Sequence, residues 1–95
     1  MSYISKRVLV RTYSAGVHFG TLESFDGKQV VLSNARRIHY WEGAFTLSAV
    51  ANRGVGSGSR LSESVPEILL TEAIEITPLS DIADKNLTGY PTHGI

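Results

Sequence analysis

The sequence predicts a small α+β protein that is mostly β, an antiparallel meander sheet of about five to six strands with one short helix packed on it. One helical segment, 47–53, follows a β-rich first half and is capped by neighbouring residues. The dipeptide Asp26-Gly27 is typical of a tight hairpin turn. The predicted strands before and after this turn are short and rich in β-branched residues. They cover 6–13, 17–25 and 29–33.

The boundaries follow from turn and cap residues. A turn at 14–16 separates the first two strands, and Gly20 inside the second indicates a bulge or the close approach of another group. Residues 35–41 extend the meander as a fourth strand. Thr46 can cap the N-terminus of the helix, and Gly54 stands where a C-terminal glycine belongs.

The last third of the chain predicts further strands and a tail. Residues 61–65 form a strand that we expect Pro66 to end, and the alternation in 71–77 predicts a strand with one wet face. Residues 1–79 are therefore expected to form a single β-rich domain. Residues 80–95 are expected to be a turn and a loosely ordered tail.

Composition limits the class of protein. The chain has 95 residues, enough for one domain with a modest core, so oligomerisation would aid its stability. It has no cysteine, which excludes disulfides, a thiolate nucleophile and cysteine-ligated metal sites. No signal-peptide core follows the N-terminus, and no apolar run approaches the ~20 residues of a membrane span. We expect a soluble, intracellular protein.

The charge is balanced overall but unevenly distributed. Residues 1–60 hold eight lysines and arginines against three acidic residues, whereas residues 61–95 hold one lysine against six acidic residues. Long duplex DNA would favour a more cationic protein, so we do not expect nucleic acid as a partner. A compact anion needs only a local cluster of arginines.

Such a cluster stands in the segment 32–44, around which the rest of the chain is organised. On a strand, Arg36 shares one face with Ile38 and Tyr40, and the opposite face carries Arg37, His39 and Trp41. One interpretation is a half-buried strand with its arginines on the surface. The other is a basic, aromatic wall that holds a planar anion, since arginine matches phosphate and an aromatic ring stacks on a base.

A Gly/Ser-rich segment, 54–60, allows two interpretations as well. It can be a flexible connector, or a flap whose backbone N–H groups cup an anion with Arg60 at its edge. It is not a phosphate-binding Walker loop, because no Gly-Lys-Ser/Thr follows.

The pattern does not predict an enzyme. His18 and His39 lie on different predicted strands, and neither a zinc-protease motif nor a nucleophile elbow is present. We therefore expect no catalytic residue, no metal and no cofactor.

The chain resembles a family of short tailed-phage proteins over roughly residues 7–77. The residues that carry the resemblance are Ser14-Ala15-Gly16-Val17-His18-Phe19-Gly20, then 32–44 with its Asn34-Ala35-Arg36-Arg37 and Tyr40-Trp41-Glu42-Gly43-Ala44, then Leu47-Ser48 and finally 68–76. The pattern is similar to the phage anti-Thoeris sponges, which sequester immune signals of the cyclic ADP-ribose type without cleaving them. Related sponges capture cyclic oligonucleotides.

The resemblance implies a homo-oligomer in the cytoplasm of an infected bacterial host, with ligand sites between subunits. It implies Arg36 or Arg37 on the phosphates, with Arg7 or Arg11 from the first strand. Where the sponges carry an aromatic residue after the loop and an asparagine on the later strand, this chain has Leu61 and Thr71. Trp41 or Phe19 would then supply the stacking ring.

Two other functions remain open. A small protein-interaction or structural module could block a host protein through Tyr40, Trp41 and Phe45 together with the acidic C-terminal third. A single-stranded nucleic-acid binder would use the same rings and arginines, although the zero net charge counts against it.

Overall fold

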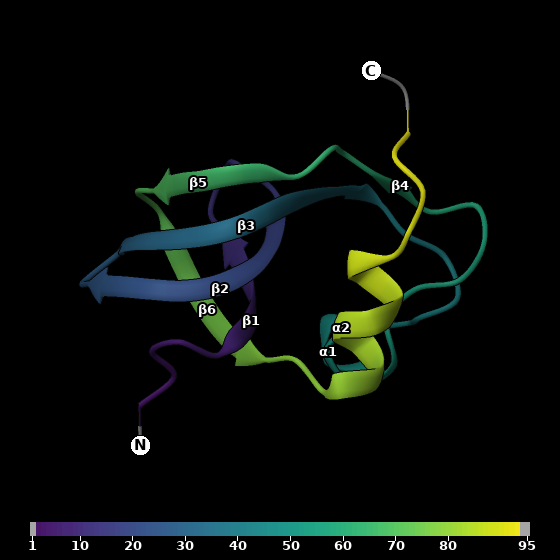
Figure 1. The fold of residues 1–95 in the computed structure, drawn as a ribbon, viewed down its shortest axis with the longest axis horizontal. Coiled ribbons are helices and arrows are strands. Elements are labelled where there is room, and N and C mark those ends of the chain that lie inside the picture. Colours follow the sequence, from purple (N-terminus) through teal and green to yellow (C-terminus); the bar gives the residue numbers. More distant parts are fainter. Residues whose placement is uncertain (1, 94–95) are drawn as a thin grey trace.

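The computed structural model describes residues 2–93. It contains one antiparallel sheet and two short helices, which confirms the predicted fold class (Figure 1). The elements in chain order are β1 (Arg7–Thr12), β2 (Val17–Asp26), β3 (Gln29–Tyr40), α1 (Leu47–Arg53), β4 (Arg60–Leu61), β5 (Val65–Leu70), β6 (Ala73–Pro78) and α2 (Asp81–Thr88).

The meander β1–β2–β3 forms as predicted. β2 ends at Asp26 and β3 begins at Gln29, and Gly27 has a φ of 60° in the turn between them. The register of β2 against β3 shifts around Gly20, where an added Cβ would lie 2.8 Å from the Ser33 carbonyl oxygen. Gly20 therefore occupies the bulge with close backbone approach that the sequence indicates.

The remaining strands extend the sheet at both ends, in the order β4–β3–β2–β1–β6 with β5 also on β3. The predicted fourth strand, 35–41, is the second half of β3 and not a separate strand. Pro66 does not end a strand either, because it lies inside β5. Within the described part of the chain β5 pairs with β3 alone, and a proline is tolerated in such an edge strand.

Apolar side chains bury both faces of the sheet. In β1, the consecutive residues Val8, Leu9 and Val10 are all buried, as expected for a strand covered on both sides. One cluster packs the sheet against the helices through Leu9, Phe19, Ile38, Val50, Leu61 and Leu87. The cluster on the other face contains Val8, Val10, Leu22, Leu32 and Leu70.

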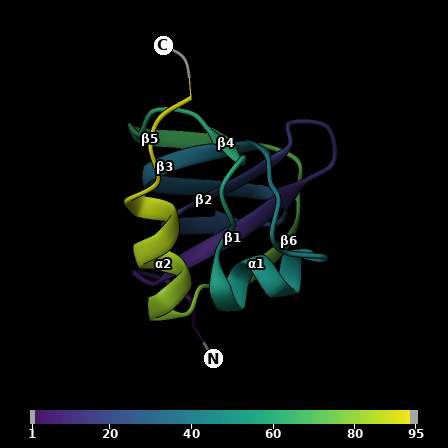
Figure 2. The same ribbon diagram turned by 90° about the vertical axis from the view of Figure 1, so that its right-hand side faces the viewer.

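The two helices lie side by side against one face of the sheet (Figure 2). Thr46 caps α1, accepting a 3.1 Å hydrogen bond from the Ala49 N–H, and Gly54 follows its last turn, as predicted. Ser80 caps α2 in the same way through the Ala83 N–H.

The expected loose tail, 80–95, instead contributes to the core. Ala83 and Leu87 of α2 are fully buried, and the chain beyond the helix forms a bridge from Thr92 to Leu61. Burial of these apolar side chains offsets the entropy of ordering the segment. Residues 94 and 95 lie outside the described part of the chain.

No helix within residues 2–93 is both long enough and apolar enough to cross a membrane.

Candidate functional site

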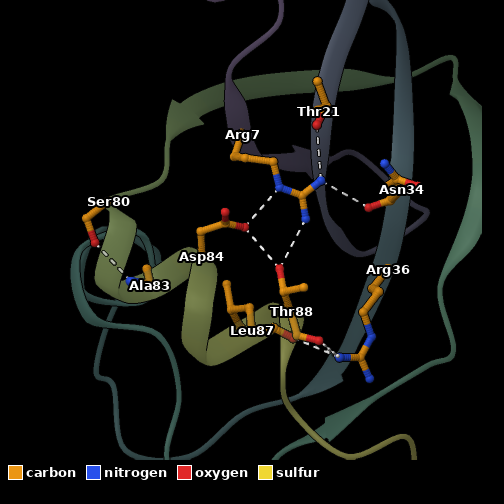
Figure 3. A network of polar contacts seen from close by, with 9 residues as sticks. All are labelled: Arg7, Thr21, Asn34, Arg36, Ser80, Ala83, Asp84, Leu87 and Thr88. Carbon is orange, nitrogen blue, oxygen red and sulfur yellow. Dashed lines mark hydrogen bonds and ion pairs between the residues drawn. The ribbon is translucent and has the colours of Figure 1, made fainter.

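Arg7, predicted as a phosphate contact, fastens α2 to the sheet. Its Nε lies 2.9 Å from Oδ1 of Asp84, and its Nη1 donates to the Thr21 hydroxyl and the Asn34 carbonyl at 3.2 Å each (Figure 3). The guanidinium also lies 5.6 Å from the centroid of the Phe19 ring. Arg7 is thus engaged within its own chain.

Arg36 performs a similar structural role at the C-terminal end of α2. Its Nη1 donates to the carbonyls of Leu87 at 2.7 Å and Tyr90 at 2.8 Å, and its Nε donates to the Ser62 carbonyl at 2.7 Å. The last carbonyls of a helix have no partner within the helix, so this guanidinium supplies one. The side chain is 6% exposed, and burial lowers its pKa, although an arginine remains protonated.

One donor of this buried arginine is left over. The Nη2 group of Arg36 has no hydrogen-bond partner among the described residues. In Figure 3, one terminal nitrogen of Arg36 faces the end of α2 and the other is turned away from it. An unpaired buried donor carries a desolvation cost of about 1–3 kcal/mol or more, which a ligand or water oxygen would offset.

Three further predicted residues do not lie at a surface site around these arginines. Phe19 and Leu61 are fully buried in the core beneath the helices, so neither side chain can contact a ligand. Thr71 is exposed, but it lies in the turn between β5 and β6. Burial therefore removes Phe19 and Leu61 from direct contact with a ligand. Thr71 stays a predicted contact, because the expected sites lie between subunits.

The Gly/Ser segment is held in place and is not an open flap. The N–H of Val55 donates to the Asn86 side chain at 2.8 Å, that of Gly56 to the Glu42 carbonyl at 2.6 Å and that of Ser59 to the Tyr90 hydroxyl at 3.0 Å. These three N–H groups are therefore unavailable to cup an anion.

The remaining aromatic and basic residues lie near the ends of the strands. The indole N–H of Trp41 donates to the Ala44 carbonyl at 3.2 Å, and its ring packs against the helix-side core. Arg60 lies 5.8 Å from the centroid of the Tyr40 ring, whose hydroxyl donates to Glu42. That hydrogen bond raises the pKa of Tyr40. Arg11 is exposed on β1, between Val17 and Glu75 of the neighbouring strands.

Arg36 and Arg37 of β3 lie beside a break in the sheet edge. β4 pairs with β3 at Ile38 and β5 pairs with it at Ala35, so residues 62–64 pass the two arginines without forming a strand. The Arg37 N–H instead donates to the Ser62 hydroxyl at 3.0 Å.

A pocket of about 230 Å³ lies at this break, and we call it the basic pocket. The Arg37 side chain is exposed there and has no hydrogen-bond partner among the described residues. Glu63, an acidic residue that is also exposed, lines the pocket as well. The residues that line the basic pocket are His18, Ala35, Arg36, Arg37, Ser62, Glu63, Val65 and Ile68.

His18 is among the residues that line the basic pocket and is almost fully buried. Its Nε2 contacts the Ala15 carbonyl at 3.0 Å, which makes this nitrogen the donor in the neutral ring. Burial lowers the pKa of His18 against the smaller raising effect of that bond, and Arg37 and His39 lower it further. At pH 7 the ring is therefore neutral and adds no positive charge to the pocket.

Sequence reasoning assigned only Arg36 and Arg37 of this pocket to a ligand site and missed its other polar residues, His18, Ser62 and Glu63. His18 lies in the block that carries the family resemblance, but nothing in that block indicates a pocket. No local motif marks Ser62 and Glu63, because only the pairing of β3 with β4 and β5 places them beside the arginines. Among the residues described, no three His, Asp or Glu side chains are grouped so that they could hold a metal ion.

Comparison with known proteins concerns both family and fold. Residues 5–87 match the model of a family described as a domain of unknown function, DUF6948. A solved heptameric archaeal Sm protein is similar in structure, with a TM-score of 0.54 at 20% sequence identity over 82% of this chain and 91% of that chain. No curated protein matches the sequence. At this identity the Sm likeness shows a common fold.

Proposed function

We propose that this chain, which belongs to the DUF6948 family of domains of unknown function, binds a small phosphorylated nucleotide signal and holds it without cleaving it. The observation that carries the proposal is the basic pocket, where Arg36 and Arg37 line one cavity. Arginine is suited to phosphate because its planar fork donates two parallel hydrogen bonds. The signal would be of the cyclic ADP-ribose type or a cyclic oligonucleotide, and the role that of a phage anti-defence sponge in the host cytoplasm.

The contacts would be divided unequally between the two arginines. The Arg37 guanidinium is exposed and free of partners among the described residues, so it would contact the phosphate directly. Arg36 is fixed by three carbonyls, so it would attract the phosphate through its charge from a position behind Arg37. Hydrogen bonds to charged groups contribute about 1.5–3 kcal/mol each, so the contact from Arg37 would supply part of the binding energy without any chemistry.

We further propose that the protein acts as a homo-oligomer. Within residues 2–93, β5 and β6 each pair with one strand, which leaves the other edge of each free. These strands expose apolar side chains, with Leu69 56% and Ile74 51% exposed. Free edges of this kind are templates for pairing with another chain. A second copy would cover them, and the similar archaeal Sm protein, itself a heptamer, supports assembly of this fold.

Native mass spectrometry with a panel of cyclic ADP-ribose isomers and cyclic di- and trinucleotides tests both proposals. We expect an oligomer that gains the mass of an intact signal and returns it unchanged on heating. An oligomer that ignores the whole panel would contradict the sponge, and a cleaved product would indicate an enzyme.

Two arginine variants locate the site. Arg37→Ala should weaken binding about 10- to 100-fold, because it removes one charge-assisted contact. Arg53→Ala removes the same charge from an exposed position on α1 and should leave binding unchanged. Equal binding by both variants would move the site away from the basic pocket.

A second candidate function is a protein-interaction module, favoured by exposed aromatic residues. The Phe45 ring is completely exposed and Tyr40 is 48% exposed, and aromatic residues of this kind are enriched in protein–protein interfaces. Stoichiometric pull-down of one host protein that is lost with Phe45→Ser, with no retained small molecule, would support this function over the sponge.

A further inference from the structure

The basic pocket is smaller than the signals proposed above. Its volume is about 230 Å³. Pockets that bury a drug-sized ligand start at roughly 300 Å³. A single sugar–phosphate unit suits the smaller space, whereas a molecule built from two or more nucleotides would extend outside it. The pocket therefore selects one unit of the ligand.

The charges of the pocket favour a singly charged group. Among the residues that line it, Arg36 and Arg37 each carry one positive charge, with the Arg36 guanidinium held at the Ser62, Leu87 and Tyr90 carbonyls. Glu63 carries one negative charge, and the buried His18 ring is neutral. The charges of the lining residues therefore sum to one positive charge. A phosphodiester carries one negative charge and matches it, whereas a terminal phosphate carries about 1.5 to 2 at pH 7.

The hydrogen-bonding groups add a second requirement. An ionised carboxylate such as Glu63 can only accept hydrogen bonds, so it repels phosphate oxygens and needs a donor from the ligand. A sugar hydroxyl is such a donor. The remaining wall is apolar, formed by Ala35, Val65 and Ile68, and can cover the carbon atoms of a sugar ring.

We propose that the basic pocket recognises one ribosyl phosphodiester unit, with Arg37 on the phosphate, Arg36 behind it and Glu63 accepting a hydrogen bond from a free ribose hydroxyl. The base lies outside the pocket. This inference rests on the proposed function only for the identity of the complete ligand, because a fragment is sufficient to test the pocket.

The smallest suitable probe is 3′,5′-cyclic AMP, a ribosyl phosphodiester with one free hydroxyl. Its 2′-deoxy analogue lacks only that hydroxyl, and 5′-AMP replaces the diester with a terminal phosphate. Titration of the full chain followed by backbone amide NMR should shift Arg37, Ser62 and Glu63. We expect 3′,5′-cyclic AMP to bind about tenfold more tightly than its 2′-deoxy analogue, the effect of one hydrogen bond to a charged group. It should also bind more tightly than 5′-AMP.

Two acidic variants provide the matched control. Both Glu63 and Glu67 are exposed, but only Glu63 lines the pocket. Glu63→Ala should abolish the discrimination between the ribose and deoxyribose probes, and Glu67→Ala should preserve it. Equal binding of the two probes by the parent protein would overturn the inference, as would unchanged discrimination in Glu63→Ala or no shifts at several millimolar probe.

Failure of this inference and failure of the proposed function would give different results. Hydroxyl-dependent binding of the fragment, with no binder in the panel of complete signals, would sustain the pocket and reject the sponge. Tight binding of a complete signal, with no discrimination between the two fragments, would sustain the sponge and reject the assignment of Glu63.

Discussion

Arg36 of β3 donates a 2.7 Å hydrogen bond from Nη1 to the carbonyl of Leu87 in the last turn of α2. The two residues are 51 positions apart in the sequence. The same guanidinium contacts the Tyr90 and Ser62 carbonyls, so it joins the C-terminal helix, the chain beyond it and the strand break. An arginine inside a sequence block that resembles a ligand-binding motif is thus a structural cap.

Arg36→Ala should therefore destabilise the fold, by about 3 kcal/mol, because it removes the guanidinium that donates to three buried or partly buried carbonyls. Arg37→Ala, its exposed neighbour, should change the free energy of unfolding by no more than about 0.5 kcal/mol. Urea denaturation of both variants measures the difference. Equal midpoints would show that the carbonyls find other partners.

Asp84→Ala should cost about 0.5–1 kcal/mol, since the pair with Arg7 is partly exposed, at 23% and 31% for the two side chains. The loss should shrink as salt is added, because ions screen such a pair. Asp81→Ala is the control, because Asp81 also lies in the first turn of α2 and shares the interaction with the helix dipole. A loss for Asp84→Ala no larger than for Asp81→Ala would exclude a contribution from the pair.

Gly20→Ala should destabilise the protein by about 1–3 kcal/mol, because the new Cβ would lie 2.8 Å from the Ser33 carbonyl oxygen. Gly27→Asn is the control: Gly27 has a φ of 60°, which asparagine tolerates, and no atom lies near its Cβ position. Thermal unfolding of the two variants compares them, and an unchanged melting temperature for Gly20→Ala would rule out the clash.

His18 should make stability depend on pH. Burial lowers its pKa below 6.5 in the folded protein, so below pH 6.5 the unfolded chain binds a proton that the folded chain does not. The contribution is fully present above pH 6.5 and is lost as the pH falls toward the folded pKa. His18→Gln should flatten unfolding free energy between pH 7 and 5 relative to the parent. The exposed His93→Gln is the control, and a parent-like slope in His18→Gln would assign the effect to other groups.

Leu69→Lys or Ile74→Lys should dissociate the proposed oligomer, because each places a charge on a free strand edge. Ile82→Lys is the matched control, since Ile82 is 70% exposed on α2 and away from both edges. Analytical ultracentrifugation reports the mass of each variant. Dissociation by Ile82→Lys alone would place the interface on the helices.

The sequence by itself determined the features that depend on neighbouring residues. Asp26-Gly27 predicted the hairpin, Thr46 and Gly54 the limits of α1, and Gly20 the bulge. Turns and caps are made by groups a few positions apart, so their residue types carry the information. The mostly β class followed from the same local signals.

Only the tertiary structure decided the roles of the side chains that these elements present. Arg36 and Arg37 are adjacent and chemically alike, yet one is fixed by carbonyls of α2 and the chain beyond it, and the other is exposed. For residues 80–95 the sequence predicted only a turn and a loosely ordered tail, because the short helix α2 depends on burying Leu87 against the sheet. Such contacts join segments that are far apart in the chain, and local residue patterns do not predict which distant groups will be in contact.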